Sequence, residues 1–159
     1  MRGERAVHVR AEVRAAQRRT TIARSVTLIV RVRIFKTKAF TRFVDKAGIP
    51  DLALCGSIRD AERGLIAADL GGGVIKQRIA RPGQGKSGGF RMLIVFKAGI
   101  RAIFVHGFAK SEKDNIEKDE LVALKKLAAE LLAYDDKTIA RVIATGALVE
   151  VACDEKTIS

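Results

Sequence analysis

Residues 74–113 read VIKQRIARPGQGKSGGFRMLIVFKAGIRAIFVHGFAKSEK, and this stretch decides the fold. Three segments rich in β-branched and aromatic residues, 74–80, 90–97 and 101–108, predict three strands. The short connection Lys97–Ile100 favours a hairpin, so the last two strands are expected to pair antiparallel. The middle strand is apolar on both faces, which is typical of a strand covered on both sides. The loop 81–89 contains four glycines and a proline and is not expected to form regular structure.

The same stretch concentrates positive charge. It holds nine basic residues and one acid, a balance of +8, whereas residues 34–73 balance at +1 and residues 114–159 at −4. The whole chain has a net charge of +12. A charge excess confined to one β-rich segment predicts a sheet face that binds phosphate, with nucleic acid as the commonest partner of this kind. An acidic protein or an anionic membrane surface is the alternative partner.

Toward the N-terminus, residues 26–36 predict a further strand. Thr37 is expected to cap a helix over Lys38–Ala47 that Gly48 ends. A second helix is expected over 51–70, stopped by the glycines at 71–73. The first 31 residues are rich in arginine and are interpreted as a basic extension that is disordered or arises from a misassigned start codon. A transit peptide is the alternative.

Toward the C-terminus, a long helix is expected over Asp119–Leu132 and a shorter one over Lys137–Thr145, capped by Asp136 and ended by Gly146. Residues 147–151 are either a strand or a packed apolar segment. The order of elements predicts an α+β domain, with a small antiparallel sheet flanked by helices, over residues 32–152. Residues 153–159 are expected to be a tail.

Several classes of function are disfavoured by the sequence. Cys55 and Cys153 have neither the spacing nor the histidine neighbours of a metal site, and no cofactor is expected. Cys55 is interpreted as a core residue, and the absence of a disulfide is expected in the reducing cytoplasm that we predict. No apolar run is long enough to span a bilayer. The segment GKS at 85–87 leads into a strand rather than a helix, so it is not a phosphate-binding P-loop.

The residues most suited to binding phosphate lie on or beside the predicted strands. A strand-anchored Arg91 can grip a phosphate with two donors, although a solvated edge arginine is the alternative. Lys76 and Arg78 share one side of their strand, and Lys86 lies in the glycine-rich loop, where a flexible hairpin without function is the alternative. A lone histidine such as His106 is more often structural than catalytic, but it is the obvious proton carrier if this is an active site.

Two motifs lead to a family resemblance. The segments IFKTKAFTRFVDKAGI at 34–49 and GGVIKQRIARPGQGKSGGFRMLIVFKAGIRAIFVHGFAKSEKDNI at 72–116 resemble the RelE/HigB superfamily of type II toxin–antitoxin toxins. The motifs RPGQGKSGGFR and FVHGFAKSEKDNI are similar to a HigB-like branch. The resemblance covers about residues 32–152. It implies a cytoplasmic toxin that cuts mRNA on the ribosome and a helix-turn-helix antitoxin that neutralises it.

The resemblance also implies a metal-free reaction, in which a ribose 2′-hydroxyl attacks the adjacent phosphate. Arg91 resembles the sheet arginine of the family, and Lys110 resembles the basic residue that closes the FAK motif. Lys110 and His106 are the candidates for the base, because Tyr134 does not fit the position of the family tyrosine. A ParE-like gyrase-inhibiting toxin and a non-enzymatic basic RNA-binding module remain as alternatives. The residues then expected to bind RNA phosphates are Lys76, Arg78, Arg81 and Lys86.

Overall fold

The predicted hairpin lies in the middle of the sheet. Strands β4 (Phe90–Lys97) and β5 (Arg101–Ala109) pair antiparallel, and Gly99 turns the chain between them at φ 76°. Strand β3 (Val74–Ile79) pairs antiparallel with the other edge of β4. The computed structural model describes residues 32–81, 88–111 and 115–153, so the expected extension at 1–31 lies outside the described residues.

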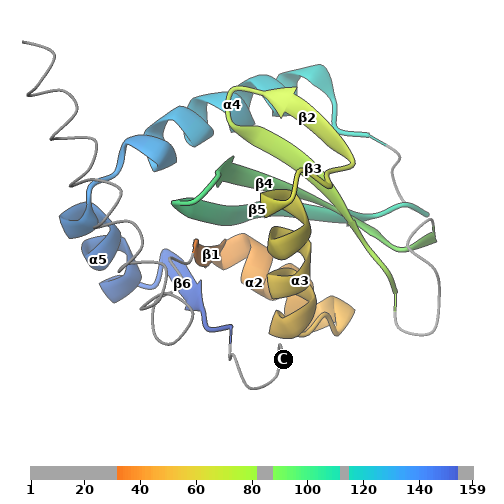
Figure 1. Ribbon diagram of the computed structural model, residues 1–159, viewed down its shortest axis with the longest axis horizontal. Coiled ribbons are helices and arrows are strands. Elements are labelled where there is room, and N and C mark those ends of the chain that lie inside the picture. The colour runs from red at the N-terminus through yellow and green to blue at the C-terminus, as the bar shows by residue number, and fades with distance from the viewer. Residues whose placement is uncertain (1–31, 82–87, 112–114, 154–159) are drawn as a thin grey trace, which may run out of the picture. The chain divides into compact units, whose positions relative to one another are not determined.

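Six strands make one sheet in the order β2-β3-β4-β5-β1-β6 (Figure 1). Strand β1 (Arg33–Thr37) runs parallel to β5, and β6 (Leu148–Val151) runs antiparallel to β1. All other pairs of neighbouring strands are antiparallel. The helices flank this mostly antiparallel sheet, which confirms the α+β fold class. Residues 148–151, left open between a strand and a packed segment, form an edge strand.

The first helix of the described region follows its local sequence signals. Helix α2 spans Lys38–Ala47, and the Thr37 hydroxyl accepts a hydrogen bond from the Phe40 backbone N–H at 3.2 Å. Gly48 ends the helix in the left-handed conformation at φ 71°, which a glycine adopts without a steric cost. Both predicted caps are confirmed. Each cap depends only on residues within one turn of the helix end, so the local sequence was enough to predict it.

The prediction of one helix over 51–70 is wrong in its second half. Helix α3 spans Asp51–Glu62, and residues Ala68–Gly71 form strand β2. Gly64 turns the chain at φ 79°, and the buried amide of Gln77 then fixes the connection. The Gln77 Nε2 donates to the Leu65 carbonyl at 2.9 Å, and the Ala67 N–H donates to the Gln77 Oε1 at 3.2 Å. Pairing with β3 therefore overrides the helical pattern in this segment.

The C-terminal helices agree with the prediction apart from one cap. Helix α4 spans Lys118–Ala133 and helix α5 spans Asp136–Ala144. The N-cap of α5 is Asp135 and not Asp136, because the Asp135 carboxylate accepts the Thr138 backbone N–H at 2.7 Å. A hydrogen bond with the Thr138 side chain, together with this backbone hydrogen bond, holds the pKa of Asp135 below its ordinary value.

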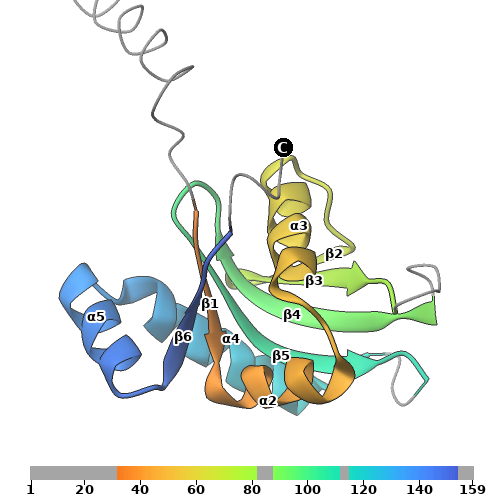
Figure 2. The same ribbon diagram turned by 90° about the horizontal axis from the view of Figure 1, so that it is seen from below.

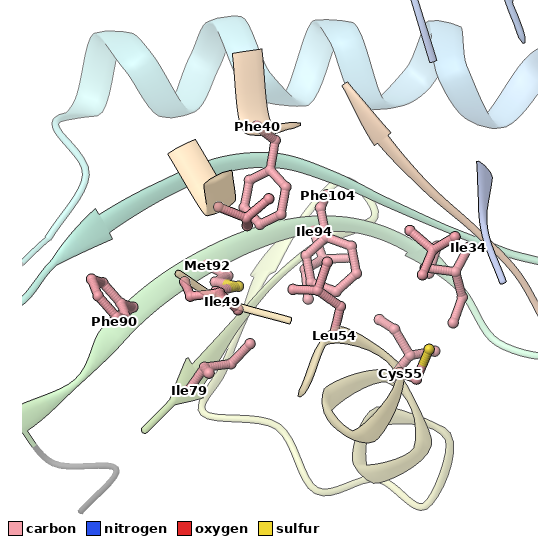
Figure 3. Close-up of a cluster of buried hydrophobic side chains, with 14 of the residues drawn as sticks. Ile34, Phe40, Ile49, Leu54, Cys55, Ile79, Phe90, Met92, Ile94 and Phe104 are labelled. Atoms are coloured by element: carbon pink, nitrogen blue, oxygen red, sulfur yellow. The ribbon is translucent and has the colours of Figure 1, made fainter. Parts of the chain in front are cut away.

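The sheet separates two hydrophobic cores. Helices α2 and α3 cover one face, and α4 and α5 contribute to the core on the other face (Figures 1 and 2). Figure 3 shows the first core, in which Phe40 and Leu54 approach Ile94 and Phe104 of the central hairpin. The rings of Phe40 and Phe104 stack with their centroids 5.0 Å apart. We call the two sides of the sheet the α2/α3 face and the α4 face.

The expected absence of a disulfide is wrong. Cys55 is a buried core residue, as predicted, but its sulfur is bonded to that of Cys153, with the two Cα atoms 6.0 Å apart. The bond joins α3 to the segment after β6, across 98 residues of sequence. The cysteines therefore no longer support a reducing compartment. Among the residues described, no helix is long and apolar enough to cross a membrane.

Candidate functional site

Two rows of side chains cross strands β3, β4 and β5 on the α4 face. Directly opposed residues in a sheet share one face, with Cβ atoms about 4.5–5.5 Å apart. In the first row Lys76 is opposite Leu93, and Leu93 is opposite His106. The second row, one pleat further along, consists of Arg78, Arg91 and Phe108. We define the cationic sheet site as the four polar members of these rows, which are Lys76, Arg78, Arg91 and His106.

A bulge in β5 brings His106 into this site. Leu93 pairs with His106, and the next residue of β4, Ile94, pairs with Phe104, so Val105 is an extra residue in β5. With strict alternation, Val105 would be opposite Leu93 and His106 would project to the α2/α3 face. The bulge keeps Val105 in the core of the α4 face and also places His106 on that face. No sequence signal marked this extra residue.

The site combines buried and accessible cations. Arg91 is only 5% exposed, between the apolar residues Leu93 and Phe108 of the α4-face core, whereas Arg78 is exposed. Lys76 is half-buried, and its Nζ donates to the Asn115 Oδ1 at 3.2 Å. Arg78 and Arg91 are directly opposed like charges, an arrangement that destabilises a sheet unless something compensates it. Two opposed guanidinium groups are chemically suited to binding an anion bidentately.

The remaining predicted residues do not all join this site. Lys110 is exposed and follows β5 directly, two positions beyond Phe108, and its backbone N–H donates to the Gly89 carbonyl at 3.2 Å. It thus lies one pleat beyond the row that contains Arg91, where β5 ends. Arg81 lies elsewhere, because its guanidinium carbon is 5.0 Å from the centre of the Phe90 ring, which belongs to the α2/α3 core. Lys86 falls outside the described residues.

Arg101 and Tyr134, which the sequence analysis also considered, lie at the other end of the sheet and contribute to its packing. Arg101 is 8% exposed, and its Nη1 donates to the carbonyls of Leu131 and Tyr134 at 2.9 and 3.0 Å, where α4 ends. It is opposite Lys97, about 20 Å along β4 from Arg91 at 3.3 Å per residue. Burial and a hydrogen bond to Glu130 raise the pKa of Tyr134. The structure therefore separates Tyr134 from the cationic sheet site.

Asn115 is a site neighbour that the residue-by-residue analysis missed. It fixes Lys76 through the hydrogen bond described above, and it lies within the motif FVHGFAKSEKDNI at 104–116, which was the available signal. The described residues contain no group of three side chains that could together hold a metal ion.

The comparisons with known proteins give one result. A family model described as the RelE toxin of the RelE / RelB toxin-antitoxin system matches residues 32–151. No curated protein and no solved structure matches the chain. The matched range includes every strand of the sheet and all four members of the cationic sheet site.

Proposed function

This chain belongs to the RelE toxin family, and from that premise we propose that it is an endoribonuclease that cuts mRNA on the ribosome. Membership makes the chain the toxin of a toxin–antitoxin system, with an antitoxin as its partner. We also propose that the antitoxin is a helix-turn-helix protein and that the toxin acts in the cytoplasm, where ribosomes work. We further propose that the chain belongs to the HigB-like branch, and the motifs at 81–91 and 104–116 support this placement.

The direct opposition of Arg78 and Arg91 is the observation that carries the proposal. The two arginines are paired across neighbouring strands, and Lys76 adds a third cation one pleat away. A phosphodiester bound at Arg91 could accept parallel N–H donors from its guanidinium. Because Arg91 is buried in an ordered strand, its donors are held in place before the substrate arrives.

The reaction that we propose begins at the phosphate held by Arg91. The ribose 2′-oxygen attacks the adjacent phosphorus, and the bond from phosphorus to the 5′-oxygen of the next nucleotide breaks. The products are a 2′,3′-cyclic phosphate and a free 5′-hydroxyl. Negative charge builds up on the phosphoryl oxygens in the transition state, and Arg91 stabilises it through donors already in place. Arg78 and Lys76 hold the flanking phosphates.

Two proton transfers complete the step. We assign the base to His106, which the bulge places in the row of Lys76, because an imidazole is the side chain best suited to accept the 2′-hydroxyl proton near neutral pH. Lys110 lies one pleat beyond the Arg91 row, and we assign it the donation of a proton to the departing 5′-oxygen. The other predicted RNA contact, Lys86, would act from the loop before β4.

The test uses the purified protein with ribosomes and a defined mRNA. Primer extension maps any cuts, and mass spectrometry identifies the new ends. We expect cuts that depend on ribosomes and end in a cyclic phosphate. Arg91→Lys keeps the positive charge but loses the guanidinium that can donate two hydrogen bonds to one phosphate. We therefore expect the cleavage rate to fall by about 10²–10³-fold. Arg59→Gln, on the exposed side of α3, is the matched control and should cut as the wild type does.

The alternatives give different results in this assay and in a parallel reaction that contains gyrase and plasmid DNA. Intact mRNA together with accumulated gyrase–DNA cleavage complexes would replace the proposal with a gyrase-inhibiting toxin. RNA that is bound but never cut would leave a non-enzymatic binding module. Wild-type cleavage by Arg91→Lys, with its folding verified by circular dichroism, would remove Arg91 from the reaction.

A further inference from the structure

We propose that the outer side of α2 is a second surface for the RNA backbone, on the opposite side of the sheet from the cationic sheet site. The surface consists of Lys38, Arg42 and Lys46, which we call the α2 stripe. The inference rests on the proposed function only in taking RNA as the anionic partner, because the stripe itself is defined by its geometry and charge.

The three cations follow one another at helical spacing. They are four residues apart, so each is about 6 Å further along the helix axis and turned by only about 40° from the one before. All three are exposed. The opposite side of the same helix is anchored in the core by Phe40 and Val44, which are 1% and 2% exposed. The stripe is therefore a row of charges on a firmly packed support.

The charges of the stripe differ from three other cations of the domain, which have acidic partners. Lys36 pairs with Asp51, Arg33 with Glu150, and Arg63 with Asp60. Among the described residues, no ion pair of this kind includes a member of the stripe. Lysine and arginine four residues apart on a helix repel one another. The exposed Asp45, three residues after Arg42, offsets only one of the three positive charges on this side of α2. A polyanion with regularly repeated charges would remove that repulsion.

Arg81 extends the cationic surface toward the end of the hairpin. Its guanidinium lies over the Phe90 ring, and Phe90 meets the Phe43 ring edge-on with centroids 5.7 Å apart. Phe43 in turn is on α2, one turn before Lys46. Cations on the α2/α3 face therefore approach the end of β4 and β5 that is opposite the Lys97–Ile100 turn. Arg91 and Lys110 lie at this same end, on the other face of the sheet. A long RNA can contact both faces, which favours RNA over a compact acidic protein as the partner of the stripe.

The experiment measures how salt weakens RNA binding by the full chain. The probe is a 2′-O-methyl single-stranded RNA, which the proposed reaction cannot cut because it has no 2′-hydroxyl. The test variant replaces all three stripe residues (Lys38→Gln, Arg42→Gln and Lys46→Gln). Each lost phosphate contact lowers the slope of log affinity against log salt by about 0.7, so the slope should fall by about 2. Between about 50 and 200 mM salt, wild-type affinity should then drop roughly twenty-fold more than that of the variant.

The matched control removes the same charge from other exposed sites (Lys97→Gln, Lys126→Gln and Lys137→Gln). We expect its slope to stay close to that of the wild type. Equal slopes for the two triple variants would overturn the proposal, because net charge alone would then explain the binding. A stripe variant with the wild-type slope would also overturn it and would leave an acidic protein as the partner. The readout is binding, so it holds or fails independently of whether the wild type cuts mRNA.

Discussion

Replacing Arg101 by methionine should destabilise the fold strongly. Arg101 is one of the basic residues that the sequence groups with the phosphate-binding segment, yet its guanidinium is buried and holds the end of α4. Methionine keeps the apolar stem and removes two hydrogen bonds from a charged donor. Each such bond contributes about 1.5–3 kcal/mol. Both come from one nitrogen, so we take the lower part of the range and expect a loss of about 3–4 kcal/mol.

The assay is urea unfolding followed by far-ultraviolet circular dichroism. The midpoint should fall while the dependence of the unfolding free energy on urea stays the same, because the surface exposed on unfolding hardly changes. At about 4 °C per kcal/mol for a domain of this size, the melting temperature should fall by about 12–16 °C. Lys97→Met is the control, since Lys97 is the exposed cross-strand partner of Arg101 and should cost no more than about 0.5 kcal/mol. A loss below about 1 kcal/mol for Arg101→Met would refute its role as the anchor of α4.

Three further changes test other contacts. Gly107→Ala would place a methyl group against the Phe43 ring and should lower the free energy of unfolding by about 1–3 kcal/mol, measured by thermal unfolding. Adding Phe43→Ala should relieve part of that cost. Strictly additive losses in the double variant would contradict the contact. Cys153→Ser should lower stability by about 2–4 kcal/mol and abolish the effect of a reductant on melting, so a wild type that melts identically with and without reductant would count against the disulfide. The Asp135 carboxylate has a lowered pKa in the folded state, so its contribution to stability is present above the ordinary value of 3.8 and is lost as the pH falls through the lower folded value. Asp135→Asn keeps the cap without the titration, and its unfolding free energy should therefore fall less than that of the wild type in acid; equal acid sensitivity would disprove the linkage.

Local signals were enough to predict the elements whose ends depend on nearby residues. Thr37 and Gly48 delimit α2, and Lys97–Ile100 sets the hairpin, because caps and tight turns act within a few residues. The helical pattern over 51–70 failed where long-range pairing decided the structure. Residues 68–70 were expected to continue the helix, but residues 68–71 pair with β3, and Gln77 holds the connection from ten and twelve residues away.

The sequence predicted a cationic site on the sheet, but it did not predict all of the residues that form it. Alternation along β3 correctly placed Lys76 and Arg78 on one side. His106 lies on the same side only because Val105 is an extra residue in β5, and no pattern in the sequence predicted that bulge. Charge counting also could not tell that Arg101 is buried under α4 or that Arg81 lies over Phe90 on the other face. These outcomes depend on strand register and on packing between distant segments.

The place of β1 in the sheet has a consequence for the order of folding. The β4–β5 hairpin closes a short loop, whereas Arg33 of β1 is paired with Arg101 and Ile34 with Val151, far along the chain. Closing such long loops costs entropy before any contact is gained, and chains rich in distant pairings fold slowly. We therefore expect the hairpin to form early and the insertion of β1 between β5 and β6 to limit the rate. Pulsed hydrogen exchange that protects β1 amides as early as hairpin amides would contradict this order.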